Sequence, residues 1–216
     1  MRLVYIEDLI DGKLPYNLNA CTIETLLAKI PNLSPRFLYA CDDVIVTRQL
    51  SKDDFFCGNY TRIKLFDGFG GYGPLWHYIT NAYLAVAEKL NLAKKPFHPE
   101  YHSVTPMVTK RVKEVYNMLQ DRLYESLTPL RNDTNFNQCL YPIYDAFKGY
   151  VIPKDYKFVY IEDNRWKKEL ADCDIVCLNN IDDTCAVVDA IEHLYGLTKC
   201  GKYEMNEAAE YNDDSD

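Results

Sequence analysis

The sequence lacks a stripe of basic residues, although it contains 24 Lys and Arg against 32 Asp and Glu. Proteins that bind duplex nucleic acid neutralise its phosphates with such stripes, so we do not expect nucleic acid as a partner. Five of the acids lie in residues 207–216, and without them the net charge changes from −8 to about −3. Because acidic segments of this kind stay solvated, we expect one domain over 1–203 and a disordered acidic tail over 204–216.

Long apolar runs are also missing. No stretch approaches the roughly 20 apolar residues that a membrane-spanning helix needs, so we expect no membrane span. Acidic residues appear by Glu7, which argues against a signal peptide and predicts a cytoplasmic protein. The eight Cys are therefore expected to be free thiols. Those from Cys173 to Cys200 lack the closely paired spacing of a zinc site, so no metal is expected there.

What is present is an alternation of β-prone and helix-prone segments. Strands are expected at 2–7, 36–41, 62–66, 156–161 and 174–177. Helices are expected at 22–30, 74–92, 107–124, 135–149 and 182–196. Such alternation predicts a single α/β domain with a mainly parallel sheet and flanking helices. The glycine-rich stretch 66–74 does not fit the spacing of a phosphate-binding fingerprint, and we expect a flexible loop there.

Two adjacent acids, Asp42 and Asp43, lie at the end of the apolar run that forms the second predicted strand. In α/β sheets, ligands collect at the carboxyl ends of strands. Neighbouring carboxylates repel each other, and a divalent cation relieves that repulsion. Mg²⁺ is commonly held by one or two carboxylates together with substrate phosphates, so one interpretation is a metal–diphosphate site. The other interpretation is a polar turn between two strands, for which Asp is a common residue.

The acidic pair stands within an ordered set of short motifs: Leu14-Pro15, Asn19, Ile23-Glu24, Ile30, Leu33-Ser34, Asp42-Asp43 and Asp54-Phe55-Phe56. This set resembles the Stealth family, which includes bacterial capsular polysaccharide phosphotransferases and the catalytic subunit of lysosomal-enzyme N-acetylglucosamine-1-phosphotransferase. Cys41 stands where that family usually has Asn before the acidic pair.

Later segments keep the order of the family's motifs, and the resemblance runs over roughly 14–195. The matching residues are Asn81, His102 and Pro106 in 101–116, Arg131 in 126–136, and Asn179 with Asn180 in 174–183. Asn180 replaces the Asp that is usual in the family. The family's opening strand motif, Thr-Trp-Val-(Asn/Asp)-Gly, does not occur in this sequence, so the domain is expected to be short at its N-terminal side.

The resemblance implies transfer of a sugar 1-phosphate from a nucleotide sugar, of the UDP-N-acetylhexosamine kind, to a hydroxyl of a glycan or sugar acceptor in surface polysaccharide synthesis. Asp42 and Asp43 would hold Mg²⁺ or Mn²⁺ against the diphosphate. Arg131 would bind phosphate oxygens through its planar guanidinium. His102 would be the general base, with His98 as the runner-up, because imidazole titrates near neutrality.

Five further residues are predicted to bind substrate: Asn19 and Glu24 at the donor or acceptor pocket, Asn81 in its helix, and Asn179 with Asn180 after the last strand. Each also has a purely structural interpretation. Glu24 is an acid in the first turn of a helix, which the helix dipole favours, and the two adjacent Asn could cap the helix that follows.

Two other functions remain open. A nucleotide-sugar glycosyltransferase would share the metal site but release the nucleoside diphosphate. A non-catalytic relative that acts through a partner chain is favoured by the missing opening motif, because an exposed sheet edge invites pairing with another chain. We would then expect a homo-oligomer or a complementing chain.

Overall fold

The computed structural model describes residues 3–10, 18–69, 73–161, 173–178 and 192. Four sequence predictions lie outside these stretches: the substrate-binding roles of Asn179 and Asn180, the acidic tail at 204–216, and the helix at 182–196 apart from residue 192.

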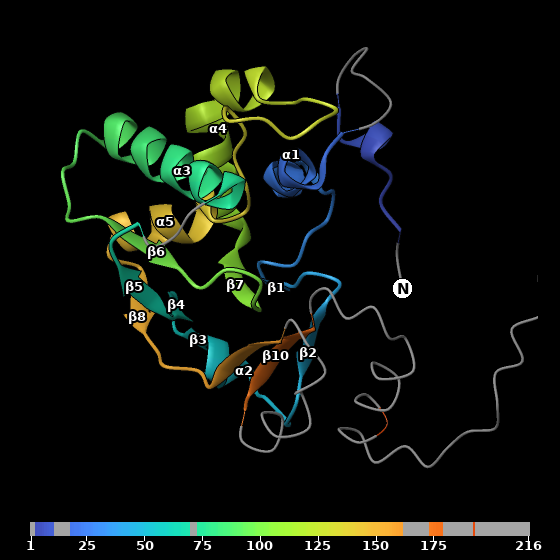
Figure 1. Cartoon of the computed structure of the whole chain (residues 1–216), viewed down its shortest axis with the longest axis vertical. Helices are drawn as coiled ribbons and strands as arrows, with labels where there is room; N and C mark the ends of the chain where they lie inside the picture. Colours follow the sequence, from blue (N-terminus) through green and yellow to red (C-terminus); the bar gives the residue numbers. More distant parts are fainter. Residues whose placement is uncertain (1–2, 11–17, 70–72, 162–172, 179–191, 193–216) are drawn as a thin grey trace, which may run out of the picture.

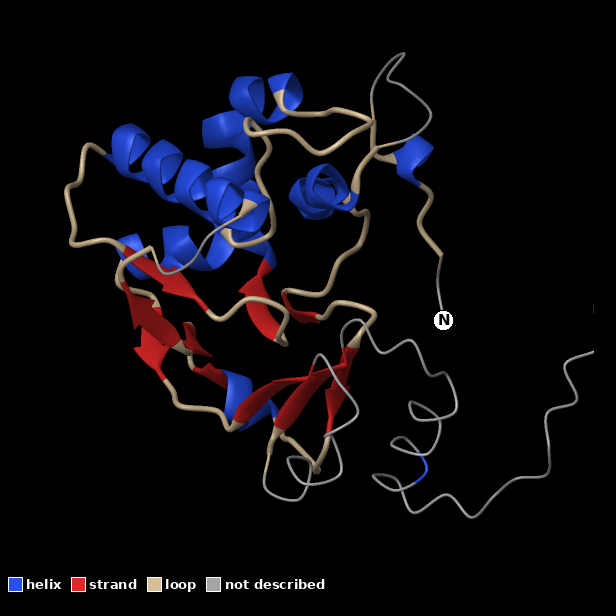
Figure 2. Cartoon of the chain, in the orientation of Figure 1, coloured by secondary structure: helices blue, strands red, loops and turns tan. Residues whose placement is uncertain are grey.

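Most helices lie together on one side of the molecule and most strands on the other, with α2 among the strands, as Figures 1 and 2 show. The helical elements are η1 (Ile6–Asp8), α1 (Ala20–Glu24), η2 (Thr25–Lys29), α2 (Lys52–Phe55), α3 (Pro74–Leu90), α4 (Thr109–Glu125) and α5 (Leu140–Phe147). The strands are β1 (Arg36–Tyr39), β2 (Val44–Val46), β3 (Phe56–Cys57), β4 (Tyr60–Ile63), β5 (Leu65–Asp67), β6 (Phe97–Pro99), β7 (Thr105–Val108), β8 (Val151–Pro153), β9 (Phe158–Ile161) and β10 (Ile175–Leu178). None of the described helices is long and apolar enough to cross a membrane.

The mixture of helices and strands is confirmed, but the expected single, mainly parallel sheet is not formed by the described residues. The strands form four small sheets, β1-β7, β2-β10-β9, β3-β4-β8 and β5-β6. Only the β9–β10 and β4–β8 pairs are parallel, and the other four pairs are antiparallel. The prediction failed because it assumed that each helix covers a parallel crossover, whereas α3, α4 and α5 pack largely on one another.

The first predicted strand, 2–7, is also wrong. Residues 3–5 have no regular structure, and the chain then makes the short 3₁₀ turn η1. Leu3 and Tyr5 remain exposed, and no strand pairs with this segment among the described residues. A β-prone sequence forms a stable strand only where a partner strand and a buried face are available.

The main core lies among the helices and the pair β1-β7. Ile79 and Val86 of α3 pack with Val115 of α4 and with Leu140 and Ile143 of α5. The apolar face predicted for 107–124 is confirmed within α4, where Val112, Val115 and Leu119 are all buried. The helix itself begins at Thr109, because 105–108 pairs with β1 as strand β7.

A buried ion pair joins α4 to α5. Arg111 Nε lies 2.6 Å from Asp145 Oδ1, and Arg111 Nη2 donates to Asp145 Oδ2 at 2.7 Å. Arg111 Nη1 also donates to the carbonyl of Asn59 at 2.8 Å, so the guanidinium reaches the β3–β4 turn as well. Burial raises the pKa of Asp145, and the bonds from Arg111 oppose that effect.

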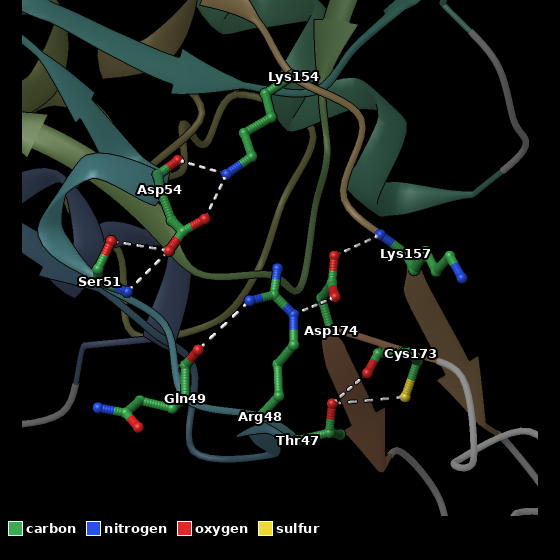
Figure 3. Close-up of polar contacts among 9 residues, drawn as sticks. All are labelled: Thr47, Arg48, Gln49, Ser51, Asp54, Lys154, Lys157, Cys173 and Asp174. Atoms are coloured by element: carbon green, nitrogen blue, oxygen red, sulfur yellow. Dashed lines mark hydrogen bonds and ion pairs between the residues drawn. The ribbon is translucent and has the colours of Figure 1, made fainter.

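A second, smaller core lies beneath the sheet β2-β10-β9, where Phe55, Phe56, Tyr156 and Ile175 pack together. It contains the Asp54-Phe55-Phe56 motif. Asp54 accepts hydrogen bonds from the Ser51 backbone at 2.7 Å and from Lys154 Nζ at 2.8 Å (Figure 3). The hydrogen bond from Lys154 is the main reason why the pKa of Asp54 is lowered.

Polar contacts also join the residues that follow β2 to the residues that precede β10. Arg48 Nε donates to Asp174 Oδ1 at 2.5 Å, and Thr47 Oγ1 donates to the carbonyl of Cys173 (Figure 3). The Arg48 contact is the first cause of the lowered pKa of Asp174. These contacts join β2 and β10 at the end of the pair that lies away from the acidic turn.

Candidate active site

The acidic pair forms the turn between two strands that belong to different sheets. Asp42 and Asp43 separate β1, which pairs with β7, from β2, which pairs with β10. The Val44 amide donates to the Cys41 carbonyl at 3.4 Å, as in a β-turn. The amide of Leu178, at the end of β10, donates to the Asp43 carbonyl at 2.9 Å, which fixes the turn against that strand.

The pairing of β1 with β7 explains why His102 lies near this turn. Tyr39 lies opposite Thr105 in the antiparallel register, and the same register continued past the strand ends places 41–43 opposite 101–103. His102 Nδ1 lies 3.4 Å from Asp43 Oδ2. His102 has a φ of 53°, in the left-handed region that few residues other than glycine adopt. Such backbone strain persists where the surrounding structure holds it, and it concentrates at functional sites.

Asp43 lies at the centre of a small polar cluster. One ligand atom each of Cys41, Asp43 and His102 lies within 4.8 Å of the others. Cys177 Sγ contacts Asp43 Oδ2 at 3.2 Å. Asp43 Oδ1 and His102 Nδ1 are buried atoms without a hydrogen-bond partner among the described residues, although Nδ1 is close to Oδ2. Asp42 is exposed and is not part of the cluster, so the metal pair Asp42–Asp43 stays a prediction.

Tyrosine rings surround the imidazole. The ring of Tyr101 meets His102 edge to face, with centroids 4.1 Å apart, and the ring of Tyr160 in β9 lies 5.7 Å away. These ring contacts limit the rotation of the imidazole, so packing as well as the nearby Asp43 carboxylate determines its position.

Glu24 connects to the cluster through two intervening side chains. Its Oε1 accepts a hydrogen bond from Tyr39 at 2.8 Å, and its Oε2 accepts one from the Gln138 amide at 3.2 Å. Cys41 Sγ lies 3.8 Å from the Tyr39 hydroxyl. Burial raises the pKa of Glu24, and it raises the pKa of the Cys41 thiol to about 12. Glu24 is thus linked to Cys41, at the start of the acidic turn, through the Tyr39 hydroxyl, and the substrate-binding role predicted for Glu24 stays a prediction.

Arg131 is exposed on the loop that follows α4, and its positive charge is felt by two groups of α1, Glu24 and Cys21. Burial raises the pKa of Glu24 and of Cys21, and the positive charge of Arg131 lowers both pKa values by a smaller amount. The charge of Arg131 thus reaches Glu24, while the phosphate-binding role predicted for Arg131 stays a prediction.

Asn19 and Asn81 hold this loop in place. Asn19 caps α1 through Thr22, and its Nδ2 donates to the Thr128 carbonyl at 2.8 Å. Asn81 Nδ2 donates to the carbonyls of Asp133 at 2.7 Å and Asn135 at 3.0 Å. These amides fix the position of the loop, and the substrate-binding role predicted for them stays untested.

His98, the runner-up base, is part of an aromatic cluster. Its ring stacks on Phe66 at 5.0 Å and meets Trp76 edge to face at 4.9 Å. Burial lowers its pKa, and its Nδ1 lies 3.1 Å from the Pro99 carbonyl. These contacts give His98 a packing role away from the acidic turn.

Sequence reasoning did not identify Tyr39, Tyr101 and Cys177 as neighbours of the site, and it treated Cys41 only as a departure from the family pattern. The signal that could have found Tyr39 and Cys41 is the period of two in β1, which points residues 37, 39 and 41 toward the same face. Cys177 could be placed only with knowledge of the pairing between β2 and β10.

Comparison with known proteins confirms the resemblance to capsular polysaccharide phosphotransferases. No family model matches the chain. A capsular polysaccharide phosphotransferase of Neisseria meningitidis serogroup B is 28% identical over 71% of this chain and 44% of the relative. One of Actinobacillus pleuropneumoniae is 28% identical over 70% of this chain and 44% of the relative, and one of Haemophilus influenzae is 32% identical over 50% and 30%. The chain thus spans less than half the length of these curated relatives.

Proposed function

We propose that this chain, as a relative of capsular polysaccharide phosphotransferases, transfers a sugar 1-phosphate from a nucleotide sugar to a glycan hydroxyl. The printed names of the relatives support a phosphotransferase that acts in capsule synthesis. In this proposal, His102 would be the base, the carboxylates of the acidic turn would hold a divalent cation, and Arg131 would bind phosphate oxygens.

The observation that carries the proposal is the position of His102 beside Asp43. The carboxylate faces Nδ1 at 3.4 Å, and in this proposal Nε2, on the other side of the ring, is the nitrogen that accepts the proton. A carboxylate beside an imidazole stabilises the imidazolium that forms when a base takes up a proton. The strained backbone of His102 and its tyrosine neighbours hold the ring in this place.

The proposed reaction forms one P–O bond and breaks another. The acceptor hydroxyl oxygen attacks the phosphorus that carries the sugar, while its proton passes to His102 Nε2. The bond from that phosphorus to the bridging oxygen of the diphosphate breaks, and the nucleoside monophosphate leaves with the electron pair. Arg131, which is exposed on the loop after α4, would neutralise phosphate oxygens.

The residues at the turn fit a divalent cation. The unpartnered oxygen Asp43 Oδ1 and the adjacent exposed carboxylate of Asp42 are oxygen donors, which Mg²⁺ and Mn²⁺ prefer. Such an ion would supply charge neutralisation to the diphosphate when bound. Glu24, Asn19 and Asn81 would shape the pocket, the last two through the loop that they hold.

The experiment that tests this function identifies the released nucleotide. Purified protein is incubated with UDP-N-acetylglucosamine or another UDP-N-acetylhexosamine, Mg²⁺ or Mn²⁺, and a mixed sugar acceptor pool, and nucleotides are separated by chromatography. We expect UMP from the wild type and from Asp53→Asn, a control at an exposed acid of α2, and none from Asp43→Asn. Release of UDP instead of UMP would mean that the protein is a glycosyltransferase. Release of UMP by a folded Asp43→Asn variant would mean that the acidic turn does not take part in the reaction.

A further inference from the structure

Cys41 adds a thiol to the acidic turn, and the geometry there differs from that of an oxygen-only metal site. The Sγ of Cys41, a carboxylate oxygen of Asp43 and a ring nitrogen of His102 all lie within 4.8 Å of one another. The three residues come from the end of β1, from the turn and from the segment before β7, so the sheet pairing brings them together.

The distances suit two ligands of one ion better than a hydrogen bond. His102 Nδ1 and Asp43 Oδ2 are 3.4 Å apart but do not form a hydrogen bond, and both Nδ1 and the second oxygen, Oδ1, are buried without a partner among the described residues. Two ligands of a tetrahedral zinc ion, each bound at about 2.0–2.1 Å, are separated by about 3.3 Å. Asp43 Oδ2 already accepts from Cys177 Sγ at 3.2 Å, whereas Oδ1 and His102 Nδ1 are the atoms without a partner in the described part of the chain. A buried polar atom without a partner is costly, and an ion bound to it would remove that cost.

We propose that Cys41, Asp43 and His102 form a binding site for a thiophilic divalent ion of the Zn²⁺ class. Thiolate and imidazole ligands favour Zn²⁺ over Mg²⁺, which prefers oxygen donors. Three protein ligands leave one tetrahedral position open, as in zinc sites that also bind water or substrate. On binding, the S–H bond of Cys41 breaks, the proton passes to solvent and the Zn–S bond forms.

The consequence rests on the proposed function and concerns its control. Zn²⁺ at this position would be bound by both Asp43 and His102. It would therefore displace the ion that holds the diphosphate and prevent His102 from acting as the base. Zn²⁺ therefore inhibits phosphotransfer by the wild type. Replacing Cys41 by Asn, the residue typical of the resembling family, removes the soft ligand and makes the reaction much less sensitive to Zn²⁺.

The direct test uses Co²⁺ as a spectroscopic probe, without nucleotide or acceptor. The full chain is made metal-free, its thiols are kept reduced with a phosphine, and Co²⁺ is added. We expect one equivalent to bind with a thiolate-to-cobalt charge-transfer band in the near ultraviolet, and Zn²⁺ to displace it. The exposed Cys57→Ser variant should keep the band, whereas Cys41→Ser and His102→Ala should lose it or bind at least about tenfold more weakly.

A band that survives unchanged in folded Cys41→Ser, or no band in the wild type, would overturn the proposal. Since neither outcome depends on turnover, the result is separate from that of the nucleotide-release experiment. A chain that binds Co²⁺ through Cys41 but releases no nucleotide would support the metal site while the proposed reaction fails.

Discussion

At the scale of single residues, the environment of Glu100 predicts a specific pH dependence of stability. Burial raises the pKa of Glu100 to about 7, and Lys64, whose Nζ lies 3.9 Å from Oε2, opposes the effect only partly. The folded state thus binds a proton more tightly than the unfolded state, whose carboxyl titrates near about 4.5.

The resulting stabilisation is present below about pH 4.5 and is lost as the pH rises to about 7, because the unfolded state loses the proton first. The full change in pKa would correspond to about 3 kcal/mol, and because solvent screens this partly exposed carboxyl we expect the free energy of unfolding to fall by on the order of 2 kcal/mol over this window. Denaturant titrations at a series of pH values check this. Glu100→Gln should remove that part of the slope, and an identical pH profile in both proteins would contradict the prediction.

A second residue-scale prediction concerns Glu24, which accepts hydrogen bonds from the Tyr39 hydroxyl and the Gln138 amide. Glu24→Ala leaves these two donors without their acceptor in a buried place, which costs about 1–3 kcal/mol for each donor that water cannot reach. Glu24→Gln keeps an acceptor and should cost less. Thermal unfolding of both variants checks the order, and equal stability of Ala and Gln variants would mean that water replaces the carboxylate.

At the scale of elements, the buried ion pair between Arg111 and Asp145 joins α4 to α5. Removing one partner leaves a buried charge, so Arg111→Ala and Asp145→Ala should each lower the free energy of unfolding by about 3–5 kcal/mol. The double variant Arg111→Met/Asp145→Leu removes both charges and should recover most of the loss. Chemical denaturation measures all three, and a double variant as unstable as the sum of the single variants would contradict this account.

The loop between α4 and α5 depends on Asn135, which is fully buried. Its Nδ2 donates to the Ser126 carbonyl at 2.8 Å and to Thr128 Oγ1 at 2.9 Å, and its Oδ1 accepts from the Asn132 amide at 2.9 Å. Asn135→Ala should therefore loosen 126–136 and displace Arg131.

Hydrogen exchange tests this prediction at the level of the loop. We expect faster exchange over 126–136 in Asn135→Ala than in the wild type, with α4 itself little changed. Asn117→Ala, at an exposed position of α4, is the matched control and should leave the exchange of the loop as it is in the wild type. Unchanged exchange in Asn135→Ala would show that the loop is held by other contacts.

At the scale of the whole molecule, local patterns predicted elements better than they predicted pairing. Apolar periodicity and Pro74 at a first turn placed α3 closely, because a long amphipathic helix depends mainly on its own sequence. The strands are only two to four residues long, and their partners lie far along the chain, so pairing direction depends on tertiary packing that the sequence pattern does not contain. The expected parallel sheet failed for this reason.

The site shows the same division. The position of Asp43 at the end of a strand and the choice of His102 came from motifs, and the structure places these two side chains next to each other. The period of two in β1 could have placed Cys41 on the face of Tyr39, but its position next to His102 requires the register of β1 with β7, which the sequence pattern does not contain. The structural part of the alternative interpretation is confirmed, because Asp42 and Asp43 form a turn between two strands.

The measurement that tests the central claim most directly is the rate of UMP release by His102→Gln. Glutamine keeps a polar side chain but does not accept a proton at neutral pH, so we predict a rate about 10²–10⁴ times lower than that of the wild type. Thermal unfolding of the same preparation shows that the fold is intact, and His77→Gln, at an exposed position of α3, is the control that should react normally. A folded His102→Gln variant that releases UMP at the wild-type rate would contradict the account.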